Sequence, residues 1–296
     1  NICNILSELQ KKTPIILSSS IQVDRENVYG QSKLGGEQAL NNLHTKNGNP
    51  IYISRFVNIF FNFSKPNYNS AVATFCHNIV NDLPIQINDP NAMIRLVYVD
   101  DVVETIWNII NNQYLENEFF DVKPEYQITV GELATTLKGF KKSRETLITD
   151  RVGTGLIRAL YSTYLSFLSP KQFDYTVPKY GDSRGVFVEM LKTPDTGQFS
   201  YFTAHPGITR GGHYHHTKTE KFLVIKGKAL FKFKHVVTGE IHELETSGDE
   251  PKIVETVPGW THDITNIGED EIVVMLWANE IFDRSKPDTY AMVLTN

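Results

Sequence analysis

Residues 207–227 read GITRGGHYHHTKTEKFLVIKG, and this stretch decides the fold expected for the C-terminal third of the chain. It places His213, His215 and Glu220 ahead of an alternating apolar run that is typical of a β-strand. Residues two apart on an extended strand share a face, so the two histidines can point the same way and Glu220 can return on the next strand. A later segment offers His262 as a fourth ligand. Imidazole nitrogens together with a carboxylate oxygen suit a divalent metal such as zinc.

The spacing of these residues resembles the first motif of the cupin family. The pattern G-x5-H-x-H-x4-E-x6-G is matched at Gly207, His213, His215, Glu220 and Gly227. The second cupin motif is met in part, at Gly259, His262 and Asn266, although the spacing before Gly259 departs from it. The resemblance implies an all-β jelly-roll barrel in which the two histidines, the glutamate and His262 hold the metal. A jelly roll that keeps polar residues in its mouth without binding metal is the alternative.

Composition narrows the class of protein. The chain has 296 residues, which is long enough for two domains. Its formal net charge is −5 and its pI is near 6.0, so the charge gives no indication of a basic surface that would bind nucleic acid. No apolar run reaches the roughly 18 residues that a membrane helix needs. Cys3 and Cys76 are the only cysteines, which favours a reducing compartment. We therefore expect a cytoplasmic protein that binds neither nucleic acid nor membrane.

The first half of the chain alternates strand-like and helix-like segments. Buried strand patterns at 13–20 and 51–58 flank a helical stretch that begins near Tyr29, and a further helical pattern covers 130–140. This alternation predicts a Rossmann-type parallel α/β sheet. The expected domains are a reductase domain at 1–150, a linker helix at 151–171 and the cupin domain at 172–296.

Tyr29 and Lys33 form a Tyr-x3-Lys pair directly after a strand that ends in Ser20. Two other such pairs, Tyr175/Lys179 and Tyr214/Lys218, lack this setting, because the first contains Pro178 and the second lies within the histidine motif. Residues four apart face each other on a helix, and an ammonium group beside a phenol of pKa about 10 stabilises phenolate. The trio suits reduction of a ketone, with Ser20 as a second hydrogen-bond donor. For the pair alone, a solvated lysine beside a tyrosine is the alternative.

The surroundings resemble the extended short-chain dehydrogenases, which act mostly on nucleotide sugars. The matching segments are LSSS at 17–20, YGQSKLGGE at 29–37, RFVN at 55–58 and RLVYVDD at 95–101. The resemblance implies Ser20, Tyr29 and Lys33 as catalytic residues, with Tyr29 and Lys33 also contacting the nicotinamide cofactor. It places Asn58 near the sugar nucleotide and Arg95 on its diphosphate. A surface ion pair is the alternative for Arg95.

The glycine-rich loop of this family is missing from the sequence. No G-x2-G-x2-G pattern follows an N-terminal strand, although the cofactor pyrophosphate needs one. Half a parallel sheet cannot cover both its faces, so we expect the chain to begin at the second half of the Rossmann domain. The choice between NADH and NADPH is normally encoded in the first half.

A reductase of this kind ahead of a cupin resembles the bifunctional enzymes of capsular polysaccharide synthesis. The resemblance implies that the cupin epimerises C3 of a UDP-linked 2-acetamido-2,6-dideoxy-4-keto-hexose. The reductase would then reduce the C4 ketone with NADPH, giving UDP-N-acetyl-6-deoxy-L-talosamine, a precursor of N-acetyl-L-fucosamine. A reductase whose cupin only dimerises or binds product is the main alternative, and an inactive sugar-binding protein is another. Cupins often pair through their sheets, so we expect a homodimer.

Two arginine segments are similar to those of the sugar-nucleotide 3,5-epimerases, RGVFVE at 184–189 and RGGHYH at 210–215. In those enzymes the histidine at the position of His213 is the base. A histidine bound to metal has no lone pair left for a proton, so we expect His213 to be a ligand here, which leaves the base unassigned. Arg184 and Arg210 are expected to contact substrate phosphates, with ion pairs at the barrel rim as the alternative.

Overall fold

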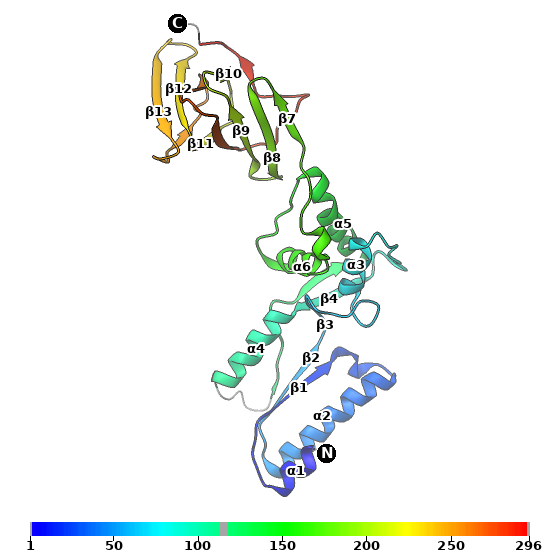
Figure 1. Cartoon of the computed structure of the whole chain (residues 1–296). Helices are drawn as coiled ribbons and strands as arrows, with labels where there is room; N and C mark the ends of the chain where they lie inside the picture. The colour runs from blue at the N-terminus through cyan, green and yellow to red at the C-terminus, as the bar shows by residue number, and fades with distance from the viewer. Residues whose placement is uncertain (1, 113–117, 295–296) are drawn as a thin grey trace. The chain divides into compact units, whose positions relative to one another are not determined.

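The computed structural model describes residues 2–112 and 118–294 and shows two compact units (Figure 1). The first unit comprises residues 1–139 and 153–170, and the second comprises 140–152 and 171–296. Within the described residues, no helix combines the length and the hydropathy that crossing a bilayer requires.

The first unit alternates helices and strands. In chain order these are α1 (Ile2–Glu8), β1 (Ile15–Ser20), the 3-10 helix η1 (Ile21–Asp24), α2 (Val28–Asn47), β2 (Ile51–Phe56), β3 (Asn58–Phe60), α3 (Ala71–Val80), β4 (Met93–Tyr98), α4 (Val99–Asn112), β5 (Glu118–Phe119), β6 (Tyr126–Thr129), α5 (Val130–Thr146) and α6 (Gly155–Ser166). One sheet is parallel, in the order β1-β2-β5, and the other has the order β3-β4-β6 with β6 antiparallel. The parallel α/β arrangement predicted for this part is confirmed.

The start of α2 is fixed by its own sequence. Asn27 caps the helix, since its side chain accepts a hydrogen bond of 2.7 Å from the Gly30 backbone N–H. Gly30 lies directly against η1, because a Cβ added there would be 2.1 Å from the carbonyl oxygen of Gln22. The first turn of α2 is therefore held beside the residues that follow β1.

The chain is divided differently from the sequence expectation around residue 150. The segment expected as a linker helix, 151–171, contains α6, which packs with α3 inside the first unit and buries Leu160 and Tyr164. Residues 140–152, which include the last turns of α5, belong to the second unit instead, because Lys192 exchanges backbone hydrogen bonds of 2.8 Å with Leu147 and Thr149.

The second unit is built from antiparallel strands. They are β7 (Lys179–Asp182), β8 (Gly185–Thr193), β9 (Gly197–Ala204), β10 (Thr209–Tyr214), β11 (Glu220–Lys226), β12 (Lys228–His235), β13 (Ile241–Ser247), β14 (Ile253–Glu255), β15 (Trp260–Asn266), β16 (Ile272–Ala278) and β17 (Tyr290–Ala291), after a short 3-10 helix η2 (Pro170–Gln172). A five-stranded sheet has the order β13-β12-β15-β10-β17, and a six-stranded sheet has the order β14-β11-β16-β9-β8-β7. The β-rich character predicted for this part is confirmed, whereas its closure into a jelly-roll barrel stays a prediction.

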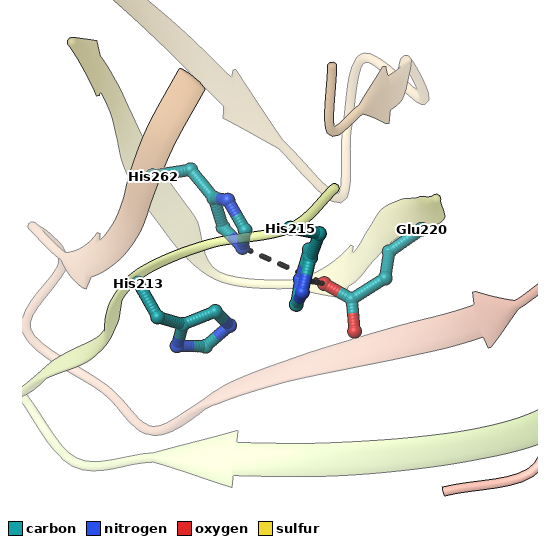
Figure 2. A group of neighbouring side chains, drawn as sticks. All are labelled: His213, His215, Glu220 and His262. Atoms are coloured by element: carbon teal, nitrogen blue, oxygen red, sulfur yellow. Dashed lines mark hydrogen bonds and ion pairs between the residues drawn. The ribbon is translucent and has the colours of Figure 1, made fainter. Parts of the chain in front are cut away.

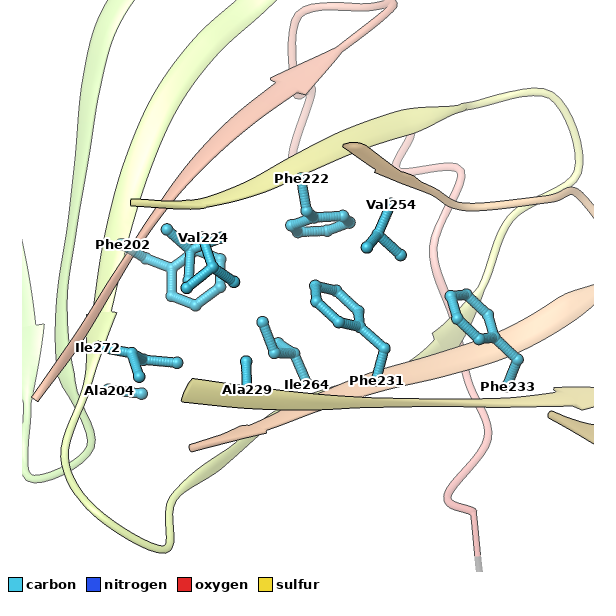
Figure 3. Close-up of a cluster of buried hydrophobic side chains, with 11 residues drawn as sticks. Phe202, Ala204, Phe222, Val224, Ala229, Phe231, Phe233, Val254, Ile264 and Ile272 are labelled. Atoms are coloured by element: carbon cyan, nitrogen blue, oxygen red, sulfur yellow. The ribbon is translucent and has the colours of Figure 1, made fainter. Parts of the chain in front are cut away.

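The two sheets enclose one apolar core (Figure 3). Inward residues alternate along β12, where Ala229, Phe231 and Phe233 are buried, as the period of two in a half-buried strand requires. The opposite sheet contributes Phe222, whose ring centroid is 5.7 Å from that of Phe231. The strands that carry the predicted ligands, β10, β11 and β15, are thus anchored on a packed scaffold.

Candidate functional site

The four predicted metal ligands converge in the second unit (Figure 2). His213 lies on β10, His215 follows in the next loop, Glu220 begins β11 and His262 lies on β15. One ligand atom from each residue lies within 4.8 Å of the others. The Oε2 atom of Glu220 is 3.2 Å from His215 Nε2 and 3.5 Å from His262 Nε2.

A β-bulge in β10 directs His213 toward the other ligands. Gly211 pairs with Asp263 and His213 pairs with His262, so Gly212 is an extra residue in the ladder. The φ angles of Gly211 and Gly212 are 103° and 76°, in the left-handed region that favours glycine. A Cβ on Gly211 would also lie 2.8 Å from the carbonyl oxygen of His262. The two glycines of the motif therefore allow the rings of His213 and His262 to pack edge to face, with centroids 4.7 Å apart.

The burial and bonding of the cluster fit a metal ion. His215, Glu220 and His262 are 2%, 5% and 4% exposed. Burial by itself would raise the pKa of Glu220, but His215, His262 and the Lys218 ammonium together hold that pKa well below its usual range. Within the described residues, neither ring nitrogen of His262 makes a hydrogen bond, although Nε2 lies 3.5 Å from Glu220 Oε2, and this is costly for a buried imidazole. A divalent cation would satisfy it, and three imidazoles with one carboxylate form a donor set that zinc accepts.

The structure adds Asp288, a residue that the sequence analysis missed. The backbone carbonyl of Asp288 is hydrogen-bonded to His215 Nδ1. Because a carbonyl can only accept, this contact fixes the proton on Nδ1 and leaves the Nε2 lone pair for the cluster. Asp288 lies far along the chain from the histidine motif, and no local pattern marks it.

Two cavities border the cluster, and both are lined by His213 and Glu220. One has a volume of about 160 Å³ and is lined by four phenylalanine rings together with Arg210 and Asp263. The other has a volume of about 250 Å³ and is lined by Lys218 and Glu280 among others. The arrangement gives a small ligand access to the candidate metal site from polar and aromatic surroundings.

The two arginines predicted to contact phosphates differ in their surroundings. Arg184 is bound by Asp182, with Nη2 2.6 Å from Oδ2, and this contact holds the pKa of Asp182 at about 2. The ion pair weighed as the alternative for Arg184 is therefore present. The Arg210 guanidinium lies 5.4 Å from the centroid of Phe202, and its Nε is buried without a hydrogen-bond partner among the described residues. Arg210 thus borders the cavity with a buried Nε that has no hydrogen-bond partner, whereas the Arg184 guanidinium is already bound by Asp182.

In the first unit, Tyr29 and Lys33 lie together at the start of α2. Lys33 Nζ is 5.6 Å from the centroid of the Tyr29 ring and donates a hydrogen bond of 2.8 Å to the carbonyl of Ser18. Tyr29 is 49% exposed, so its hydroxyl can be reached by a substrate. Ser20 ends β1, where its Oγ accepts a 3.2 Å hydrogen bond from the Gln22 N–H. The structure thus pairs Tyr29 with Lys33 and places Ser20 at the carboxyl end of a parallel strand.

Asn58 and Arg95 are neighbours in the second sheet of this unit. Asn58 Nδ2 donates a 2.9 Å hydrogen bond to the Arg95 carbonyl. The Arg95 guanidinium makes two bonds to the carboxylate of Glu125, at 2.6 and 2.7 Å, which lower the pKa of Glu125. The ion pair weighed as the alternative for Arg95 is present. A phosphate bound by Arg95 would have to compete with Glu125, which the sequence analysis did not identify.

A buried carboxylate connects the helix that carries Tyr29 and Lys33 to the neighbouring strands. Glu37, one turn after Lys33, accepts hydrogen bonds of 3.1 and 2.8 Å from Arg55 on β2 and a further one from Ser19 on β1. These contacts outweigh the effect of burial and lower the pKa of Glu37. The carboxylate therefore joins α2 to both neighbouring strands.

Replacing Glu37 by Gln is expected to destabilise the protein by about 3 kcal/mol, near the lower end for breaking a buried ion pair, because Arg55 is partly exposed. The change keeps the side-chain volume but leaves the guanidinium unpaired. Urea unfolding would measure the loss, and Glu26→Gln, an exposed change just before α2, should leave the midpoint unchanged. An unaltered midpoint for Glu37→Gln would show that the network contributes nothing to folding.

His213 is expected to make the metal-free protein less stable in mild acid. Burial, with a smaller contribution from the neighbouring His262, lowers the pKa of His213 from 6.5 to about 4. Between these values the unfolded chain binds a proton that the folded chain does not, so stability falls by up to about 3 kcal/mol as the pH drops through this window. Glu220 acts in a different window, since a lowered carboxyl pKa contributes stability above about pH 4.5 that is lost below it.

Unfolding by urea between pH 7 and pH 4 tests this expectation. His213→Gln should flatten the decline between pH 6.5 and 4, whereas His242→Gln, on exposed β13, should retain it. The same slope in both variants would assign the acid sensitivity to other groups.

Comparisons with known proteins agree with the two units. Residues 8–122 match the NAD dependent epimerase/dehydratase family, and residues 180–290 match the polysaccharide biosynthesis C-terminal domain. Over 290 residues the chain is 58% identical to the UDP-2-acetamido-2,6-beta-L-arabino-hexul-4-ose reductase of Pseudomonas aeruginosa, covering 98% of this chain and 78% of that protein. A spore coat polysaccharide biosynthesis protein of Bacillus subtilis, SpsL, is 22% identical over 120 residues, covering 37% of this chain and 80% of SpsL.

Solved structures similar to this chain indicate the same family. The capsular polysaccharide assembling protein CapF of Staphylococcus aureus superposes with a TM-score of 0.92 at 44% identity, covering 99% of this chain and 80% of CapF. CapF with the inhibitor 3-isopropenyl-tropolone matches with a TM-score of 0.89 at 42% identity, covering 99% of this chain and 82% of that chain. The chain belongs to the family that includes CapF and the UDP-2-acetamido-2,6-beta-L-arabino-hexul-4-ose reductase.

Proposed function

We propose that the chain is a bifunctional nucleotide-sugar enzyme of surface polysaccharide synthesis. The second unit would epimerise C3 of a UDP-2-acetamido-2,6-dideoxy-4-keto-hexose, and the first would reduce the C4 ketone with NADPH to UDP-N-acetyl-6-deoxy-L-talosamine, a precursor of UDP-N-acetyl-L-fucosamine. The observation that carries the proposal is the 58% identity, over 98% of the chain, to a reductase named for a 4-keto UDP-sugar. We also propose that the enzyme is cytoplasmic and that it is a homodimer formed through the second unit, since cupins often pair through their sheets.

In the reductase step, the proton and the hydride come from different sources. When bound, the nicotinamide cofactor supplies the hydride to C4. Tyr29 then donates its phenolic proton to the developing alkoxide, and the Lys33 ammonium beside it stabilises the phenolate that remains. Ser20 donates a second hydrogen bond to the same oxygen through its own O–H, while its Oγ continues to accept from the Gln22 N–H. Asn58 and Arg95 would contact the sugar nucleotide, the latter after release from Glu125.

In the epimerase step, the acidity of the C3 proton depends on the neighbouring ketone. We infer that the second unit is a cupin jelly roll and that His213, His215, Glu220 and His262 hold a divalent metal, with zinc as the expected ion. When bound, such an ion stabilises negative charge on the ketone oxygen. Arg210, with its unpartnered Nε, would hold the substrate diphosphate, joined by Arg184 once it releases Asp182.

A second candidate is a reductase whose cupin binds no metal and serves for dimerisation. One observation favours it: Lys218 Nζ lies 3.0 Å from Oε1 of Glu220, and both side chains are less than 10% exposed. The lysine therefore compensates the buried carboxylate without an ion. The unpartnered nitrogens of His262 favour the metal-binding candidate instead.

Proton NMR in heavy water separates the two candidates. The protein is mixed with the UDP-4-keto-6-deoxy sugar in the absence of a nicotinamide cofactor. Loss of the C3 proton signal supports an epimerase that works independently of the reductase. If the signal persists while added NADPH is oxidised, the bifunctional proposal fails and the chain is a reductase alone. If NADPH is not oxidised either, both candidates fail.

A further inference from the structure

The segment 279–292, here called the C-terminal strap, crosses the loop that carries the candidate ligands. At its start, Asn279 accepts a 3.0 Å hydrogen bond from the Thr219 N–H and donates one of 3.3 Å to the Thr217 carbonyl. At its end, β17 pairs with β10, and the Met292 N–H donates to the Gly212 carbonyl at 2.9 Å. The strap is therefore hydrogen-bonded both to the loop 215–219, here called the ligand loop, and to the strand β10 that precedes it.

Asp288 makes the densest set of contacts in this strap. Its Oδ1 accepts from the His216 N–H at 2.9 Å, and its Oδ2 accepts from the N–H groups of Thr217 and Lys218 at 2.6 and 2.8 Å. The Thr217 hydroxyl donates to Oδ2 as well, at 2.9 Å. One carboxylate thus receives three successive backbone N–H groups of the loop between two candidate ligands, His215 and Glu220.

The same residue also contacts a ligand directly. The carbonyl of Asp288 is the partner of His215 Nδ1, so the backbone and the side chain of one residue hold both the ring and the loop that follows it. Burial alone would raise the pKa of Asp288, but its backbone hydrogen bonds hold that pKa well below its usual range. The carboxylate is therefore charged at neutral pH, and charge-assisted hydrogen bonds are stronger than neutral ones.

We propose that Asp288 is a positioning residue of the metal centre: its carboxylate fixes the loop 215–218 so that its own carbonyl orients His215 Nε2 toward Glu220. This inference rests on the proposed metal site. It implies that the strap prearranges the ligands before an ion arrives, since Asp288 holds His215 and the following loop through contacts between protein groups. Without the carboxylate, three backbone N–H groups would lose their acceptor and the loop would be free to move.

Asp283 provides a matched control within the same strap. Its Oδ1 accepts hydrogen bonds of 2.8 and 2.7 Å from the backbone and the hydroxyl of Ser285, so it also organises a turn. None of these contacts reaches the ligand loop. If substitutions acted only by loosening the strap, replacing either Asp283 or Asp288 should weaken metal binding to the same extent.

The test measures the affinity of the full chain for Zn²⁺ and Co²⁺ by competition with a chelator, together with the absorption spectrum of the Co²⁺-bound protein. Asp288→Ala is expected to weaken binding by about 10- to 100-fold, as loss of an outer-shell partner does elsewhere, and to alter the cobalt spectrum. Asp288→Asn, which retains an acceptor oxygen, should fall between Asp288→Ala and wild type. Asp283→Ala should stay within about twofold of wild type. In the metal-free protein, amide hydrogens of residues 216–218 should exchange faster in Asp288→Ala.

The outcomes separate the two proposals. If wild type binds neither ion, the metal site fails and the role of Asp288 fails with it. If wild type binds but the folded Asp288 variants match it in affinity and spectrum, only the role of Asp288 is overturned. An equal loss in Asp283→Ala would also overturn it, because the effect would then belong to the strap as a whole. Should Asp288→Ala not fold, the same comparison is made with Asp288→Asn.

Discussion

Tyr29→Phe is expected to lower kcat for reduction of the C4 ketone by about 10³-fold while leaving C3 proton exchange at its wild-type rate. A positioned general acid contributes roughly 10²- to 10⁴-fold, and phenylalanine cannot donate the proton. The change removes one exposed hydroxyl from the first turn of α2, and no described hydrogen bond of the Tyr29 side chain is lost. NADPH oxidation with the C3-epimerised ketone measures the first activity, and deuterium exchange measured by NMR gives the second.

Tyr175→Phe is the matched control for this experiment. Tyr175 is also 49% exposed and also precedes a lysine by four residues, but it lies in the second unit and follows no parallel strand. The Tyr175→Phe variant should therefore reduce the ketone at the wild-type rate. Retention of more than about a tenth of the activity in Tyr29→Phe would remove Tyr29 from the proton transfer. Loss of both activities in Tyr29→Phe would show that the two sites do not work independently.

The ligand cluster could be predicted because most of its geometry is local. His213, His215 and Glu220 lie within one strand-loop-strand segment, and the pattern of apolar residues after them fixes the strand that follows. His262 could be added because it belongs to a second motif, and the structure pairs it in register with His213. Spacing along the chain is enough where the ligands lie within one short strand-loop-strand segment or belong to a second recognisable motif.

The partners of the predicted residues could not be foreseen in the same way. Glu125 binds Arg95 and Asp182 binds Arg184, so two residues expected to contact substrate are engaged in ion pairs. Asp288 reaches the ligand loop from 70 residues beyond Lys218. The contacts of Glu125 and Asp288 depend on how distant segments pack, and a single sequence carries no periodic signal for them. Asp182 is only two residues from Arg184, but the two side chains meet because of the turn between β7 and β8.

The exact ends of helices are also hard to predict from the sequence. From the sequence alone, Asp100 or Asp101 is well placed to cap a helix that begins at Val102, but α4 begins at Val99 and both aspartates lie in its first turn. Negative charge near a helix N-terminus is favourable at the cap and in the first turn alike, so the residue type alone cannot fix the boundary.

His262→Ala is expected to reduce C3 proton exchange by about 10³-fold and to leave reduction of the C3-epimerised ketone unchanged. A metal that polarises a carbonyl stabilises the transition state by several kcal/mol, and each 1.36 kcal/mol is a factor of ten in rate. Removing Glu220 would be a poorer test, because its loss leaves the buried Lys218 ammonium unpaired and endangers the fold. Removing His262 takes away its 3.5 Å contact to Glu220 Oε2, but that carboxylate keeps His215 and Lys218 as partners, so no buried polar group is left unsatisfied.

His242→Ala is the control for lost packing. The rings of His242 and His262 lie 6.3 and 6.4 Å from the same Phe233 ring, but His242 is on the exposed strand β13 and outside the cluster. The control should keep its metal content and exchange C3 protons at the wild-type rate, whereas His262→Ala should lose both properties. Exchange that persists in His262→Ala after its metal is lost would show that the ion is structural and that proton abstraction depends on side chains outside the cluster. Reduction is assigned to the first unit. A parallel loss of NADPH oxidation in His262→Ala would therefore contradict the proposal that each unit performs its own reaction.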